Sequence, residues 1–127
     1  MNRMLIDPKL YNVDQSWHYE TLWELEQGKR RHKVKVEICR NAYNFQSYGR
    51  ASLFSPTHMQ WTCVAETPGP QLTCLGLSYV MTDASPHLKE LEADTFKLIY
   101  EVGQLLDIEV CEAEMRPPAK EKERKHA

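Results

Sequence analysis

The sequence has few glycines and none of the glycine-rich motifs that bind phosphate groups. Glycine accounts for 5 of the 127 residues, and neither a Gly-x-Gly-x-x-Gly motif nor a Walker loop occurs. The Gly-x-Ser-x-Gly motif of serine hydrolases and the His-Glu-x-x-His motif of zinc peptidases are also missing. The chain therefore carries no motif for nucleotide binding or for these kinds of hydrolysis.

The four cysteines are too few and too widely spaced to predict a disulfide framework. None forms a Cys-x-x-Cys pair, and the 5 histidines show no paired metal-ligand spacing. A domain of this length can bury a core without such cross-links. We therefore predict no metal and no cofactor, and four free thiols at Cys39, Cys63, Cys74 and Cys111.

Long hydrophobic runs are absent as well. No segment approaches the roughly 18 apolar residues that a membrane span needs, and residues 1–8 lack the apolar core of a signal peptide. We expect a soluble protein of the reducing cytoplasm with no membrane partner.

The length and the 42% hydrophobic content are those of one ordinary domain. The last residues, from Arg116, are charged and include two adjacent prolines, a composition typical of disorder. The predicted organisation is a single domain over residues 1–115 followed by a disordered charged tail over residues 116–127.

In the middle of the chain, apolar and polar residues alternate as they do in half-buried strands. Val34, Val36 and Ile38 alternate with charged residues, which predicts one buried and one wet face over residues 33–39. Further strands are expected from composition and from the turn signals between them. They cover residues 47–55, 58–66 and 72–80, with a short last strand at 107–112.

Two helices are predicted around these strands. Asp14 or Ser16 can cap a first helix that runs to about Gln27, with Gly28 as its stop, after an irregular stretch over residues 1–12. Ser85-Pro86 opens a second helix. Its apolar stripe has the width of a helix that lies on a sheet, and consists of Leu88, Leu91, Thr95, Leu98, Val102 and Leu105. The predicted fold is α+β, an antiparallel meander of three to five strands with an N-terminal helix and a long C-terminal amphipathic helix packed on one face.

Charge is distributed unevenly along the chain. Residues 29–50 hold seven basic residues and one acid, a net +6, whereas residues 89–115 hold two basic residues and eight acids, a net −6. Such a dipolar chain can attract an acidic partner at one surface and a basic partner at another, or pair its two halves with each other.

The connection over residues 40–50 has the composition of a recognition surface. Tyrosine and arginine are favoured at the centres of protein interfaces, and aromatic rings also stack on single-stranded nucleic acid. The alternative is that the asparagines make a turn while the rings cover the core. Two aromatic residues of the first helix join the candidates for partner contact, which are Arg40, Asn41, Tyr43, Asn44, Phe45, Gln46, Tyr48, Arg50, Trp17 and Trp23.

Three functions remain open at this point. The favoured one is a non-enzymatic module that binds another protein as an inhibitor, adaptor or accessory protein, for example of a phage or plasmid, with homodimer formation as a variant. The second is a nucleic-acid-binding protein that uses residues 29–50. The expected helix–meander–helix order resembles that of double-stranded-RNA-binding domains, although the second helix is acidic where that family needs lysines. The third is a small enzyme whose site forms only on folding, and for it no catalytic residue is assigned.

Overall fold

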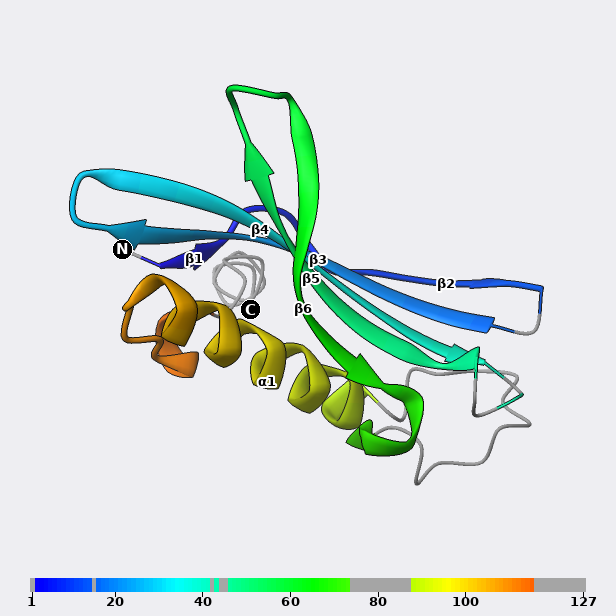
Figure 1. The fold of residues 1–127 in the computed structure, drawn as a ribbon. Coiled ribbons are helices and arrows are strands. Elements are labelled where there is room, and N and C mark those ends of the chain that lie inside the picture. The colour runs from blue at the N-terminus through cyan, green and yellow to red at the C-terminus, as the bar shows by residue number, and fades with distance from the viewer. Residues whose placement is uncertain (1, 15, 42, 44–45, 74–87, 116–127) are drawn as a thin grey trace, which may run out of the picture.

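The computed structural model describes residues 2–14, 16–41, 43, 46–73 and 88–115, and it combines one antiparallel sheet with one long helix. The helix α1 lies along one face of the sheet, against its four longest strands (Figure 1). The strand order is β1-β3-β4-β5-β6, and β2 pairs beside β1 on the same edge of β3. The elements are β1 (Arg3–Met4), β2 (Lys9–Val13), β3 (Ser16–Gln27), β4 (Arg30–Asn41), β5 (Tyr48–Ser55), β6 (Gln60–Pro68) and α1 (Leu88–Leu106).

The predicted N-terminal helix is wrong, because this segment forms strand β3. Its side chains alternate, and Tyr19, Thr21 and Trp23 are buried toward α1. Aromatic and β-branched residues at a spacing of two favour a strand over a helix. The residues interpreted as helix cap and helix stop are turn residues instead. Asp14 and Gly28 have φ angles of 48° and 60° and lie just before and just after β3.

The predicted meander is confirmed for β4, β5 and β6, and β3 joins it in place of the predicted helix. Strands β4, β5 and β6 overlap the predicted segments 33–39, 47–55 and 58–66, and each pairs with the next. Val34, Val36 and Ile38 are buried as their alternation predicts. A β-bulge between Ala51 and Ser52 interrupts the pairing of β5 with β6. Beyond it, the β5–β6 hairpin bends away from α1 (Figure 1).

The N-terminal segment is ordered, contrary to the irregular stretch predicted for residues 1–12. Strands β1 and β2 both pair with β3, and the Leu5 amide between them donates to the Leu22 carbonyl at 2.8 Å. Asn2 ties this end of the chain to two other segments. Its side-chain oxygen accepts from the Glu26 amide at 2.9 Å, and its side-chain nitrogen donates to the Glu109 carbonyl at 3.1 Å.

Helix α1 is confirmed and supplies the second layer of the core. Its buried face includes Leu91, Phe96, Leu98 and Val102. The Phe96 ring lies 5.5 Å from the Trp23 ring at a tilt of 59°, a favourable aromatic geometry. The predicted start of the helix at Ser85-Pro86 lies outside the described residues. Within the described residues, no helix has the length and hydropathy needed to cross a membrane.

The chain after α1 turns back without forming the strand predicted at 107–112. Asp107 has a left-handed φ of 56°, and the Ile108 amide donates to the Gly103 carbonyl at 2.7 Å. This is the geometry of a helix C-cap. A short 3-10 helix η5 (Glu112–Met115) follows and buries Met115 beside β1.

The other expected strand, residues 72–80, lies mostly outside the described residues. After β6, a 3-10 turn η2 (Gly69–Gln71) leads to Leu72, which is buried. The Thr73 amide then donates to the buried Asp94 carboxylate at 2.6 Å, so the chain here is directed toward α1. The predicted tail at residues 116–127 also lies outside the described part.

Candidate functional site

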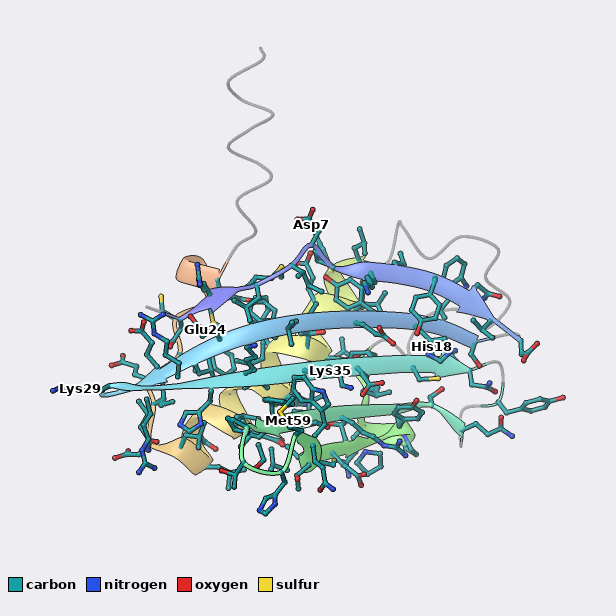
Figure 2. All side chains as sticks on the ribbon, turned by 90° about the horizontal axis from the view of Figure 1, so that it is seen from above. Asp7, His18, Glu24, Lys29, Lys35 and Met59 are labelled. Atoms are coloured by element: carbon teal, nitrogen blue, oxygen red, sulfur yellow. The ribbon has the colours of Figure 1, made fainter. Side chains whose placement is uncertain are left out.

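The face of the sheet opposite α1, here called the open face, is covered by no element in the described part of the chain. Figure 2 is seen from this side, with α1 behind the sheet. Pairing of the strands places two rows of side chains across this face. A charged row consists of Lys9, Glu20, Glu37, Arg50 and Glu66. A neighbouring row, rich in rings, consists of Tyr11, His18, Cys39, Tyr48 and Pro68.

Charges of both signs lie on the open face, and some of them form ion pairs across strands, although Glu20 and Glu37 are cross-strand neighbours of like sign. Arg50 lies 3.4 Å from Glu66, and Arg3 lies 3.3 Å from Glu24. Six basic and five acidic residues share the face, which leaves it close to neutral. They are Arg3, Lys9, Arg31, Lys33, Lys35 and Arg50 with Glu20, Glu24, Glu26, Glu37 and Glu66. Exposed pairs of this kind add little stability, so their main effect is on what the face can bind.

Cationic side chains lie over aromatic rings on the open face. The Arg50 guanidinium lies 4.1 Å from the centre of the Tyr48 ring, and the Lys35 ammonium lies 4.8 Å from the Trp61 ring. The Phe54 ring packs against Trp61 at 5.2 Å. These contacts orient large side chains that remain partly accessible, since Trp61 keeps 38% of its surface exposed.

A third group of side chains lies where β2 meets β3. The Tyr11 ring stacks on His18 with centroids 5.0 Å apart and planes 14° apart. The Tyr11 hydroxyl donates to Glu20 Oε1 at 2.5 Å. This hydrogen bond to a carboxylate is the main cause that raises the pKa of Tyr11 to about 12, and burial and the charge of Glu20 add to it.

We expect Tyr11 to ionise near pH 12 and the variant Glu20→Gln to bring its pKa back toward the ordinary value of about 10. Because the folded chain holds the phenolic proton more tightly than the unfolded chain, the hydrogen bond stabilises the fold below pH 10. That contribution is lost as the pH rises from 10 to 12. Subtracting the ultraviolet titration of Tyr11→Phe from that of the wild type isolates this group among the six tyrosines. A Tyr11 pKa unchanged in Glu20→Gln would contradict the assignment.

Four of the predicted contact residues lie at or near one end of the open face. Tyr48 and Arg50 are on it, and Tyr43 and Gln46 are exposed in the connection between β4 and β5. Asn41 shapes this connection through two hydrogen bonds. Its side-chain oxygen accepts from the Tyr43 backbone amide at 2.8 Å, and its own backbone amide donates to Ser47 Oγ at 2.9 Å. The turn-forming alternative therefore holds for Asn41.

Other predicted contact residues face the opposite side of the sheet. Trp23 is 1% exposed in the core and Arg40 is 2% exposed, so neither can contribute to a surface in this fold. Trp17 is half-buried on the α1 side, opposite Arg40. The predicted contact role is thus wrong for Trp23 and Arg40. Asn44 and Phe45 lie outside the described residues.

Sequence reasoning missed several members of the open face. Tyr11, His18, Lys35, Phe54 and Trp61 were not among the candidates. The alternation of residues 16–27 contained the signal, because a strand there places His18 and Glu20 on the face shared with Lys35. The helix assigned to this segment concealed it.

The structure brings one cysteine and one histidine together. Cys39 pairs with His18 across β3 and β4 on the open face. Burial raises the pKa of the Cys39 thiol, which disfavours the thiolate that a nucleophile requires. In the part of the chain that the structure describes, no group of three potential metal ligands occurs. The Cys39–His18 pair therefore lacks the lowered thiol pKa of an activated nucleophile.

A pocket between the N-terminal strands and α1 is too small for a ligand. It has a volume of about 30 Å³, room for little more than a water molecule, and Met4, Trp23, Phe96 and Met115 are among its lining residues.

Comparisons with protein-family models, curated proteins and solved structures gave no significant match to this chain.

Proposed function

We propose that this chain is a non-enzymatic, cytoplasmic protein-binding module, an inhibitor, adaptor or accessory protein, and that its partner docks on the open face. The observation that carries the proposal is the set of partly exposed rings held in place by cations, Tyr48 under Arg50 and Trp61 under Lys35. Tyrosine, tryptophan and arginine are the residues most enriched at the energetic centres of protein interfaces. Rings already fixed in position lose less conformational entropy on binding.

The near-neutral charge of the open face favours a protein partner over nucleic acid. A phosphate backbone is bound by an excess of lysine and arginine. Here the basic stretch 29–50 meets acids from neighbouring strands, as in the pairs Arg31–Glu26 at 3.8 Å and Arg50–Glu66 at 3.4 Å. The likeness to double-stranded-RNA-binding domains also loses its basis, because the first helix of that order is a strand in this chain.

The proposal is tested with the tagged full chain as bait in host lysate, with and without nuclease. We expect a stoichiometric protein partner that survives nuclease. The double variant Arg50→Ala/Trp61→Ala should bind the purified partner at least about tenfold more weakly, since interface hot spots cost about 2 kcal/mol or more each.

The matched control replaces a cation and a ring on the exposed side of α1, as Lys97→Ala/Tyr100→Ala. This variant should retain the affinity of the wild type. Equal binding by the open-face variant, shown to be folded by circular dichroism, would reject the proposal. Loss of the bound material on nuclease treatment would instead support the nucleic-acid alternative.

A further inference from the structure

The two halves of the open face differ in charge. The half nearer the β3–β4 and β5–β6 turns, here called the ring end, contains the rings of Phe54 and Trp61 together with four basic residues and two acids. This net +2 comes from Arg3, Arg31, Lys33 and Lys35 with Glu24 and Glu26. The other half has a net −1, from Lys9 and Arg50 with Glu20, Glu37 and Glu66. The near-neutral total therefore combines a basic end and an acidic end.

The charge at the ring end is concentrated on two lysines. Both acids there already face an arginine, Glu24 at 3.3 Å from Arg3 and Glu26 at 3.8 Å from Arg31. Among the described residues, no ion pair joins Lys33 to an acid, and the ammonium of Lys35 lies 3.9 Å from Glu37. An exposed pair of that length holds its lysine only weakly. Both lysines can therefore meet an acidic partner.

The same two lysines lie beside the rings at the base of the β5–β6 hairpin. The hairpin leaves the sheet at the bulge after Ala51 and bends away from α1 (Figure 1). The Lys33 ammonium is 5.9 Å from the centre of the Phe54 ring, and the Lys35 ammonium is 4.8 Å from that of Trp61. The hairpin itself, over residues 51–65, contains no aspartate, glutamate, lysine or arginine. Apolar surface and positive charge thus meet at one place.

Two features favour a protein segment over nucleic acid at the ring end. The rings of Phe54 and Trp61 pack against each other at 5.2 Å with a tilt of 57°, and each has a lysine beside it. This arrangement hinders the flat stacking of a base on either ring. Glu24 and Glu26, on the neighbouring strand, oppose a phosphate backbone that would cross the sheet.

We propose that the ring end binds an acidic segment of a partner protein that carries an apolar side chain between its acids. The acids face Lys33 and Lys35, and the apolar side chain contacts Trp61 and Phe54, so that charge and apolar surface are matched together. This inference rests on the proposed function, because it names the chemistry of the partner that docks on the open face.

The test uses a fluorescein-labelled nonapeptide with a central phenylalanine between glutamates, titrated into the full chain and followed by fluorescence anisotropy. The wild type should bind this peptide more tightly than the same peptide with lysine in place of glutamate. It should also prefer it to a peptide with serine in place of phenylalanine. The affinity should fall as salt is raised from about 50 to about 500 mM, because salt screens exposed charges.

The variant Lys33→Glu/Lys35→Glu should bind the glutamate peptide at least about tenfold more weakly and should now prefer the lysine peptide. The matched control, Lys89→Glu/Lys97→Glu, makes the same change of charge on the exposed side of α1 and should retain the affinity of the wild type. Trp61→Ala should also weaken the glutamate peptide. The bound peptide should slow the acetylation of Lys33 and Lys35 by acetic anhydride, measured by mass spectrometry, but not that of Lys89 and Lys97.

Four results would overturn the inference. The first is no binding of the glutamate peptide by the wild type, and the second is equal binding by Lys33→Glu/Lys35→Glu. The third is an equal loss in the α1 control, which would mean that only net charge matters. The fourth is tighter binding of an oligothymidylate of the same charge than of the peptide.

Failure of this inference can be told apart from failure of the proposed function. A purified partner that is lost with Arg50→Ala/Trp61→Ala but is bound normally by Lys33→Glu/Lys35→Glu would reject the acidic chemistry alone. A partner bound normally by both folded variants would reject the open face as the docking surface.

Discussion

Trp23→Ala is expected to lower the free energy of unfolding by about 3–5 kcal/mol, the range for truncation of a buried aromatic residue. The indole is 1% exposed and lies between the sheet and α1, where it packs against Phe96 at 5.5 Å. Its nitrogen donates to Thr21 Oγ1 at 2.7 Å, so truncation also leaves a buried hydroxyl with one contact fewer. Because a domain has only about 5–15 kcal/mol of stability in total, this change should bring the chain close to unfolding.

The measurement is urea denaturation followed by circular dichroism, and the chain offers a matched control. Trp61→Ala removes the same side chain from the open face, where 38% of it is exposed and no second layer covers it. We expect that variant to lose about 1 kcal/mol or less. Equal losses in the two variants would show that the Trp23 side of the sheet is not the core.

Gly103→Ala should destabilise the chain by about 2 kcal/mol, although alanine favours a helix more than glycine by about 1 kcal/mol. A Cβ at Gly103 would lie 2.8 Å from Val110 Cγ2 and 2.9 Å from the Ile108 carbonyl oxygen. The Ile108 oxygen belongs to the backbone, which cannot move aside as easily as the end of a flexible side chain. In the variant, movement of Ile108 away from the added Cβ would also disturb the hydrogen bond from the Ile108 amide to the Gly103 carbonyl, which is 2.7 Å long.

Thermal melts of Gly103→Ala and of the double variant Gly103→Ala/Val110→Ala test this explanation. Removing the Val110 methyl groups should recover only part of the loss, since the clash with the Ile108 oxygen remains. A melting temperature raised by Gly103→Ala alone would mean that the chain after α1 does not pack back against the helix.

The sequence was most informative where one physical signal acts alone. Strand β4 and helix α1 have clear periods of 2 and 3.6, and both were predicted as elements of the right type, although β4 spans Arg30–Asn41 where residues 33–39 were predicted. Strand β3 was mistaken for a helix because Asp14 and Gly28 serve equally well as helix boundaries and as left-handed turn residues. Only the strict alternation between them separates the two interpretations.

The candidate site was only partly predictable for a related reason. Tyr48 and Arg50 were identified by composition, but composition does not reveal on which face a side chain lies. Arg40 is the last but one residue of β4, yet it points to the buried side opposite Trp17. The ring pairs on the open face require the cross-strand register, which places Lys35 near Trp61 although 26 positions separate them in the sequence.

The position of α1 at the end of the fold has a consequence for synthesis on the ribosome. Strands β3 to β6 pair with their neighbours in sequence, so the sheet can form as the chain emerges, N-terminal strands first. The helix that covers Trp23, Val34 and Val36 is translated only after residue 87. Until then the nascent sheet exposes its apolar face, and chaperones that bind newly made chains have a defined interval in which to protect it.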